Sequence, residues 1–194
     1  MKTTVLAMTV AALGLVANSA MAQEPGPWLV RVRVVDIQPV NNSDPVGGVG
    51  ASDRITVSNK AIPEIDISYF FTPNIATELI LTYPQKLDVA LDGSNIGNFK
   101  ALPPTLTLQY HFLPSASISP YIGAGINYTN ISSVSLLNGA AGLDHSSIGA
   151  ALQAGLDFKI DKNWSLNLDV KKVQIRSDVT VSGTKISNVR LDPN

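Results

Sequence analysis

The sequence predicts an all-β protein, an antiparallel transmembrane β-barrel, and three observations support this prediction. Apolar and polar residues alternate with period 2 in several segments, and the connections between these segments are alternately short and long. Charged residues make up only 15% of the chain. Soluble domains usually contain about 25%. Much of the surface is therefore expected to face something other than water.

The N-terminal segment has the layout of a secretory leader. Lys2 precedes an apolar run from Val5 to Ala17, and Ala20-Met21-Ala22 forms a small-x-small cleavage site. The run is too short for a membrane-spanning helix, which needs about 20 apolar residues. We expect a signal peptide over residues 1–22 with cleavage after Ala22, and a single barrel domain over residues 23–194.

The composition excludes several classes of protein. The chain has no cysteine, which excludes a disulfide-stapled scaffold, a structural zinc site and a thiol nucleophile. The formal net charge is -1 at pH 7, and nothing forms the basic patch that contacts to nucleic-acid phosphates require. We expect no nucleic-acid partner.

Two segments alternate without exception. Between Thr105 and Phe112 every second residue is Leu, Tyr or Phe, and the residues between them are Thr, Gln and His. The segment from Trp164 to Lys171 repeats this pattern. Weaker copies lie at 28–37, 64–71, 75–83, 121–128 and 148–159. Together these segments predict seven strands.

The connections between the predicted strands fall into two series. The short ones are 72–74, 113–120 and 161–163, and the long ones are 38–61, 84–101, 129–146 and 176–188. Outer-membrane barrels have short periplasmic turns and long extracellular loops. We therefore expect the long series to face the cell exterior.

One face of each predicted strand is aliphatic or aromatic, and the other carries the ionisable side chains. A basic side chain that faces lipid at mid-membrane costs about 2–4 kcal/mol, so the ionisable face is expected to point into the barrel. This polar set comprises Arg31, Arg33, Glu64, Asp66, Glu78, Asp157, Asp169 and Lys171.

Aromatic residues on the apolar face lie mostly near strand ends. They predict two aromatic girdles: Trp28, Tyr69, Phe71, Tyr83, Tyr110, Phe112, Tyr128, Phe158 and Trp164. A soluble β-sandwich or lipocalin-like barrel shows the same alternation with an apolar core and a wetted polar face. The leader, the aromatic residues and the two loop series favour the membrane protein.

Three motifs carry a resemblance to a known family. They are PYIGAGINYT at Pro120–Thr129, LPPTL at Leu102–Leu106 and VRLDP at Val189–Pro193. With these motifs the chain resembles the OmpW family of outer-membrane proteins, which includes the alkane-uptake protein AlkL. The resemblance implies an eight-stranded barrel with a narrow, largely apolar lumen in a Gram-negative outer membrane, and uptake of small hydrophobic compounds.

The sequence departs from the family pattern after the RLDP motif. In the family this motif leads into a final strand that ends in an aromatic residue, whereas here Asn194 follows Pro193. A barrel needs closure because an open sheet edge in lipid leaves backbone groups unpaired. We expect a truncated sequence or a fragment that cannot insert stably alone, with unpaired edges on strands 28–37 and 164–173.

The polar set admits two interpretations. Arg31 and Arg33 are expected to meet Asp66 on the next strand, with Glu78 within reach of the same layer. These charges could form a gate or selectivity ring. The interpretation that we favour is a structural plug, in which opposite charges paired across neighbouring strands fill a narrow lumen.

Pro103 and Pro104 lack backbone N–H groups at the point where a strand should pair with its neighbours, so the ladder is expected to open there. The alternative is that they simply mark the start of the strand. Resemblance to the family, in which a lateral opening has been proposed, favours an exit for apolar cargo. An apolar funnel above the plug is expected from Val35, Ile37, Ile80, Leu102, Leu136, Leu137 and Val173, although ordinary loop packing explains each one singly.

Catalysis has little support in the sequence. Asp144-His145-Ser146 places triad residue types side by side, but triad groups converge from separate segments. We expect no enzyme activity, no cofactor and no metal. The leading hypothesis is a passive channel for small hydrophobic molecules, and the alternative is a non-conducting surface anchor or receptor that acts through its loops. The expected partners are outer-membrane lipid, small hydrophobic molecules and the barrel-assembly machinery.

Overall fold

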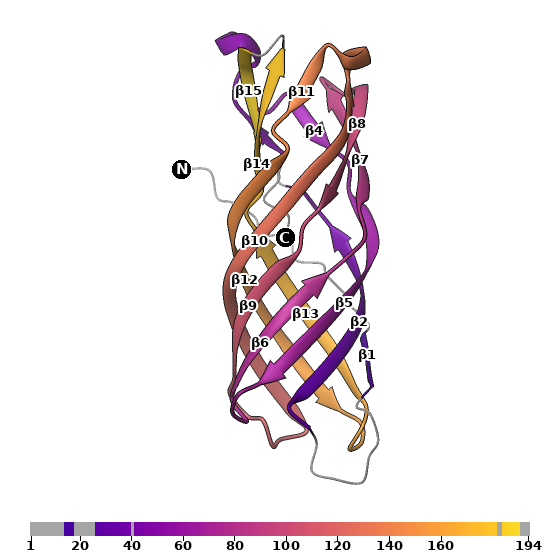
Figure 1. Ribbon diagram of the computed structural model, residues 1–194, viewed down its shortest axis with the longest axis vertical. Helices are drawn as coiled ribbons and strands as arrows, with labels where there is room; N and C mark the ends of the chain where they lie inside the picture. Colours follow the sequence, from indigo (N-terminus) through magenta and orange to yellow (C-terminus); the bar gives the residue numbers. More distant parts are fainter. Residues whose placement is uncertain (1–13, 18–25, 40, 182–183, 191–194) are drawn as a thin grey trace.

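The computed structural model describes residues 14–17, 26–39, 41–181 and 184–190. Most of this part of the chain is antiparallel strand, and the strands wrap around one long axis (Figure 1). Two 3-10 turns interrupt them, η1 (Val46–Gly48) and η2 (Leu137–Gly139). Within the described residues, no helix has the length and apolar character needed to span a membrane.

The wall of the barrel consists of β1 (Gly14–Ala17), β2 (Trp28–Ile37), β5 (Lys60–Phe70), β6 (Ile75–Leu81), β9 (Thr105–His111), β10 (Ile118–Leu136), β12 (Ser146–Lys159) and β13 (Ser165–Val173). From β2 to β13 each strand of the wall pairs antiparallel with the next one along the chain. All seven predicted strands are present, so the predicted antiparallel all-β fold is confirmed.

The segments expected as long loops hold further strands. These are β3 (Asn42–Ser43), β4 (Ile55–Val57), β7 (Gln85–Leu91), β8 (Ser94–Leu102), β11 (Ala141–Leu143), β14 (Arg176–Val181) and β15 (Thr184–Arg190). They continue the barrel beyond the wall, at the end opposite the short turns (Figure 1). We call these strands, together with the distal part of β10, the extension. The expectation of seven strands joined by loops therefore undercounted the strands.

The β7–β8 hairpin shows why the extension forms. Its turn is Asp92-Gly93, and both residues have positive φ, 50° and 80°. This is the mirror-image turn that suits the twist of a hairpin, and Asp-Gly is one of its preferred sequences. The strands on either side then pair from Gln85–Ala101 to Leu91–Ser94.

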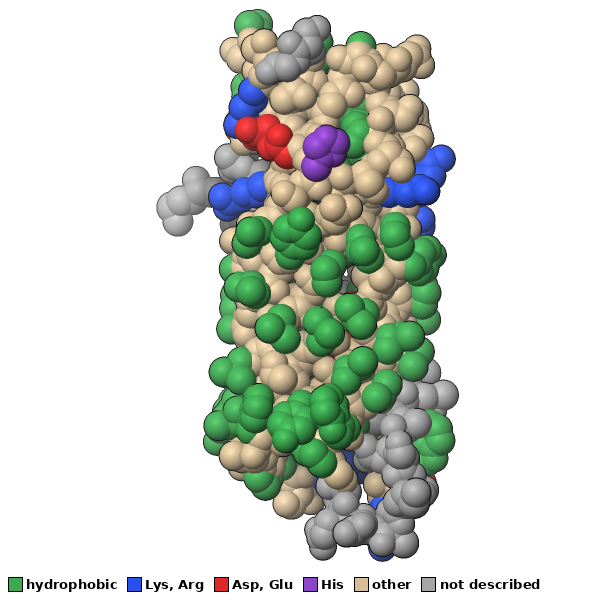
Figure 2. Space-filling model, viewed as in Figure 1, with side chains coloured by type: hydrophobic (Ala, Val, Ile, Leu, Met, Phe, Trp, Pro, Cys, Tyr) green, Lys and Arg blue, Asp and Glu red, His purple; other side chains and the backbone are tan. Residues whose placement is uncertain are grey.

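The wall is apolar outside and polar inside. Along β9, Leu106, Leu108 and Tyr110 are exposed, whereas Thr107 and Gln109 are 1% exposed. Figure 2 shows apolar side chains spread over the lower two-thirds of one face, with charged side chains and a histidine above them. This distribution matches a lipid-facing barrel and excludes the soluble alternative, whose exposed face is polar.

The aromatic residues are concentrated at the end with the short turns. Trp28, Tyr69 and Phe71 form a chain of edge-on ring contacts with centroids 4.8 and 5.1 Å apart, and Tyr110 meets Phe112 at 5.1 Å. At the other edge of the apolar band, the girdle residues are Tyr83 and Tyr128. The two predicted girdles are therefore unequal among the described residues.

Strand β1 lies between β2 and β13, where we expected two unpaired edges. Leu15–Ala17 pair with Val30–Val32, and Gly14–Leu15 pair with Leu166–Asn167. These four residues belong to the predicted leader, so they fill a short part of the seam while the leader is attached, and the expectation of unpaired edges in the mature chain stays a prediction. Residues 1–13 and 18–22 of the predicted leader, residues 23–25 after it, and Leu191–Pro193 of the VRLDP motif lie outside the described residues.

Gly125 and Gly155 are among the wall glycines at which there is no room for a side chain. A Cβ on Gly125 would overlap the Leu106 backbone, and one on Gly155 would overlap the ring of Tyr121. Gly155 is the direct cross-strand partner of Tyr121. The glycine therefore leaves the space in which the tyrosine ring turns into the lumen.

Candidate functional site

The lumen inside the wall is filled by a network built around two arginines. Alternation along β2 turns Arg31 and Arg33 inward, and their exposed fractions are 0% and 1%. Arg31 Nη1 lies 2.7 Å from Glu78 Oε1 on β6, and its Nη2 lies 2.9 Å from Asp157 Oδ2 on β12. One guanidinium therefore joins opposite sides of the barrel.

Arg33 lies one layer higher. Its Nη1 is 3.0 Å from Asp66 Oδ2 and 3.7 Å from Asp169 Oδ1, and its Nη2 is 3.5 Å from Glu78 Oε1. Asp66 is the direct cross-strand partner of Arg31, yet its ion pair is with Arg33. The expected contact with Asp66 is thus found for Arg33, whereas Arg31 forms ion pairs with Glu78 and Asp157.

Lys171 and Glu64 close the upper edge of the network. Lys171 Nζ donates to Glu64 Oε1 at 2.9 Å, and Arg33 Nη1 is 3.4 Å from the same oxygen. The structure thus brings all eight residues of the predicted polar set into one connected cluster. The cluster contains five carboxylates and three basic side chains.

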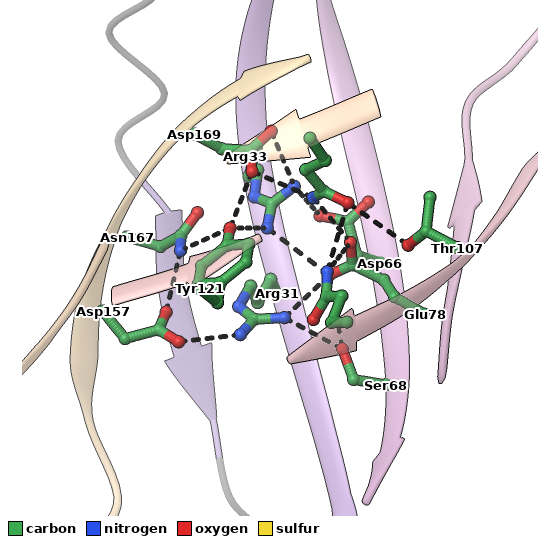
Figure 3. Close-up of polar contacts among 12 residues, drawn as sticks. Arg31, Arg33, Asp66, Ser68, Glu78, Thr107, Tyr121, Asp157, Asn167 and Asp169 are labelled. Carbon is green, nitrogen blue, oxygen red and sulfur yellow. Dashed lines mark hydrogen bonds and ion pairs between the residues drawn. The ribbon is translucent and has the colours of Figure 1, made fainter. Parts of the chain in front are cut away.

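Neutral side chains that sequence reasoning missed complete the network. Tyr121 Oη donates to Asp169 at 2.7 Å, Gln153 Nε2 donates to Glu78 at 2.8 Å, and Asn167 Nδ2 donates to Asp157 at 2.7 Å. Figure 3 shows Tyr121 beside both arginines, with the carboxylates around them. These residues lie on the same inward face of their strands as the charged set, so the same alternation could have identified them.

The network costs free energy unless every member is paired, because buried charges lose their hydration. Glu78 illustrates how the cost is offset: it accepts from Arg31, Gln109 and Gln153, and its exposed fraction is 0%. We call this set of interior charges and their neutral partners the plug. Its ion pairs span the lumen from β2 to β6 and β12.

Above the plug, the extension encloses an apolar core. It includes Ile55, Val57, Leu87, Val89, Phe99, Ala101, Ile131, Leu136, Ala141, Leu143, Ala151, Val173, Ile175 and Val179. A cavity of about 20 Å³ lies between some of these side chains. The apolar side chains of this region therefore pack closely against one another.

The residues expected to line a funnel fall into three groups. Leu136 and Val173 belong to the apolar core, and Ile80 is buried at 2% exposure. Val35, Ile37 and Leu102 are half-buried. Leu137 is 45% exposed in the η2 turn with φ 48°, so its assignment to an interior funnel is wrong.

Pro103 and Pro104 separate β8 from β9. On the β10 side the ladder stays connected, because Tyr128 N donates to Pro104 O at 3.0 Å and Asn127 Nδ2 reaches both proline carbonyls at 3.2 Å. On the other side, pairing stops at Ile80–Thr105 and resumes at Gln85–Ala101. The wall therefore has a one-sided interruption beside Thr82–Pro84.

A larger cavity, about 570 Å³, opens at the end with the short turns. Its lining includes Phe70, His111, Asp157, Lys159 and Trp164. The plug forms its inner end, since Asp157 also binds Arg31. Within the described part of the chain, no three His, Asp or Glu side chains lie close enough together to hold a metal ion.

A wall that is apolar outside, a lumen filled by charges and short turns at one end together define an outer-membrane β-barrel protein. The chain belongs to the OmpW family, whose model matches residues 24–194. This places it in the outer membrane of Gram-negative bacteria, in a family of non-enzymatic transport or structural proteins.

Relatives and solved structures agree with this assignment. The chain is 42% identical over 184 residues to the uncharacterized outer-membrane protein y4mB of Sinorhizobium fredii (strain NBRC 101917 / NGR234), covering 91% of this chain and 80% of the relative. It is 32% identical over 201 residues to outer membrane protein W of Escherichia coli (strain K12), covering 96% and 93%. The crystal structure of OprG from Pseudomonas aeruginosa has the same fold, with a TM-score of 0.76, 23% identity and coverage of 87% and 90%.

Proposed function

We propose that the protein is a passive outer-membrane channel for small hydrophobic molecules, which enter through the extension and leave sideways into the membrane beside Pro103 and Pro104. The observation that supports this most is the order in which apolar and charged side chains follow one another along the barrel axis. An apolar core lies directly above a charged plug, and the wall is interrupted between them on the β6–β7 side.

The plug argues against a straight route through the barrel. An apolar molecule that crossed it would have to separate buried ion pairs such as Arg31–Glu78 without replacing their hydrogen bonds. A sideways exit avoids this cost, because the molecule passes from apolar core to lipid. The prolines favour an opening there because neither has an N–H to pair across the gap.

Entry requires the extension to loosen. Sites for small molecules usually have volumes of about 300–1,000 Å³. The apolar core holds a cavity of about 20 Å³. Cargo must therefore displace side chains contributed by hairpins such as β7–β8. No energy source is needed, since hydrophobic transfer drives movement into the bilayer.

The test is uptake of a lipophilic tracer by cells that lack the protein and by the same cells expressing it. We expect faster uptake with the protein and no change for a small polar tracer. Pro103→Ala with Pro104→Ala should slow uptake, because restored N–H groups can pair across the gap. Pro114→Ala, in a short turn, is the matched control. Equal lipophilic uptake with and without the protein would remove the proposal.

One observation favours a second candidate, a non-conducting surface anchor or receptor. Side chains occupy the described interior at two levels, in the packed apolar core and in the plug. Such a protein would act through segments 38–61 and 129–146. Deleting these segments would abolish its partner binding, whereas substitutions in the lumen would leave it intact. Planar-bilayer recordings with lipophilic ions separate this candidate from a channel.

A further inference from the structure

Three lysines gather at the outer edge of the apolar band. Lys86 on β7 and Lys100 on β8 are direct cross-strand partners, and both side chains are exposed. Lys60, at the start of β5, donates from Nζ to the Lys86 carbonyl at 3.0 Å. Figure 2 shows basic side chains on the side of β7 and β8, immediately above the apolar side chains. We call these residues the lysine cluster.

No residue of the lysine cluster forms an ion pair with an acidic side chain in the described part of the chain. The ion pairs found there involve other basic residues, and none includes Lys60, Lys86 or Lys100. The nearest acid along β7 is Asp88, whose cross-strand partner is Asn98. Like charges directly opposite each other on neighbouring strands are destabilising. An anion placed between them would remove this repulsion.

Apolar surface continues directly below the lysine cluster. Leu79, Leu81 and Tyr83 are 39%, 38% and 52% exposed on β6 and the segment that follows it, and Leu106 is 46% exposed on β9. Leu108, the next outward-facing residue on β9, continues this apolar surface toward the short turns. A ligand that matches both parts carries an anionic head and apolar chains.

We propose that Lys60, Lys86 and Lys100 bind the phosphate of an outer-leaflet lipid headgroup, whose acyl chains lie against the apolar surface formed by Leu79, Leu81, Tyr83 and Leu106. The height of the cluster supports a lipid as the source of the phosphate, because it lies where the apolar band ends. Basic residues at this level attract anionic headgroups in other membranes. This proposal does not depend on the channel function.

The test uses the purified full chain in neutral detergent, titrated with a phosphorylated glycolipid and with the same glycolipid after enzymatic removal of its phosphates. Bound lipid is counted by native mass spectrometry. The test variant combines Lys86→Gln and Lys100→Gln. The control variant combines Lys159→Gln and Lys162→Gln, which replace two exposed lysines at the opposite end of the barrel. Lys86→Arg with Lys100→Arg keeps both charges, and inorganic phosphate serves as a competitor.

The phosphorylated lipid should bind more tightly than the dephosphorylated one, and the Lys86/Lys100 glutamine variant should lose about 30-fold in affinity. The arginine variant and the Lys159/Lys162 variant should bind like the parent chain. Equal binding of the two lipids, or an equal loss in both glutamine variants, would overturn the proposal. Inorganic phosphate binding as tightly as the lipid would also overturn it, since the site would then recognise free phosphate. Unchanged migration as a folded, heat-modifiable band checks that each variant is folded.

Discussion

Arg31 and Glu78 form a fully buried ion pair across the lumen, with Nη1 and Oε1 2.7 Å apart and neither side chain exposed. Glu78 also accepts hydrogen bonds from Gln109 at 2.6 Å and Gln153 at 2.8 Å. These partners come from β2, β9 and β12, so one carboxylate ties together strands that are not neighbours. The plug therefore stabilises the barrel by linking its strands, in addition to obstructing its lumen.

Glu78→Gln should strongly destabilise the folded protein, because it leaves Arg31 and Arg33 short of a buried counter-charge. Breaking a buried pair costs about 3–5 kcal/mol. The free energy of unfolding by urea in detergent micelles measures the effect. Asp88→Asn, an exposed substitution, is the control and should change stability by less than about 0.5 kcal/mol. Equal stability of the two variants would contradict the role given to Glu78.

Gly155→Ala should destabilise the barrel, because the new methyl group overlaps the Tyr121 ring. Overpacking of this kind costs about 1–3 kcal/mol. In a Tyr121→Leu background the same change should cost less, with the overlap on the Leu168 carbonyl oxygen remaining, and a double-mutant cycle of unfolding free energies measures the difference. A cost that is the same in both backgrounds would show that the glycine serves some other purpose.

The Arg54–Asp92 pair in the extension gives a pH prediction. Arg54 Nε donates to Asp92 Oδ1 at 2.9 Å, and this hydrogen bond lowers the pKa of the Asp92 carboxyl below its ordinary value. Its contribution to stability is therefore present above the pKa of the unfolded chain and is lost as pH falls through the lowered, folded-state pKa. NMR titration should show the pKa of Asp92 returning toward the ordinary value in Arg54→Gln. Arg176→Gln should leave it unchanged, and a lowered pKa that survives Arg54→Gln would refute the pairing.

Export should remove the predicted leader. We expect mass spectrometry of the protein recovered from the cell envelope to find an N-terminus at Gln23, and Ala22→Leu to block this cleavage. Cleavage there would also remove β1 from between β2 and β13. A recovered protein that still begins at Met1 would show that residues 1–22 are not a leader.

The wall could be predicted from the sequence because the pattern that defines each of its strands lies within that strand. Alternation within one strand settles which side chains share a face, so the eight charged residues of the plug were found without knowing their partners. The partners themselves depend on the stagger of strands around the barrel. This is why Asp66 was expected to meet both arginines, whereas its ion pair is with Arg33.

The extension was harder to predict, for two reasons. The turn signal Asp92-Gly93 was present, but the strands beside it are short and alternate less regularly. The apolar core also joins residues far apart in the chain, such as Ile55, Phe99 and Val179, and no local pattern links them. Leu137 was misplaced because hydrophobicity alone does not reveal a positive φ in an exposed turn.

The central claim is that the barrel is apolar toward lipid and polar within, and spin-label accessibility along β9 tests it most directly. The chain has no cysteine, so single cysteines introduced at positions 105–111 each carry one unambiguous label. In reconstituted bilayers, labels at positions 106, 108 and 110 should collide frequently with dissolved oxygen and rarely with a water-soluble nickel reagent, with labels at the positions between them protected from oxygen. Nickel collisions that peak at 106, 108 and 110 would contradict the claim, because those side chains would then face water.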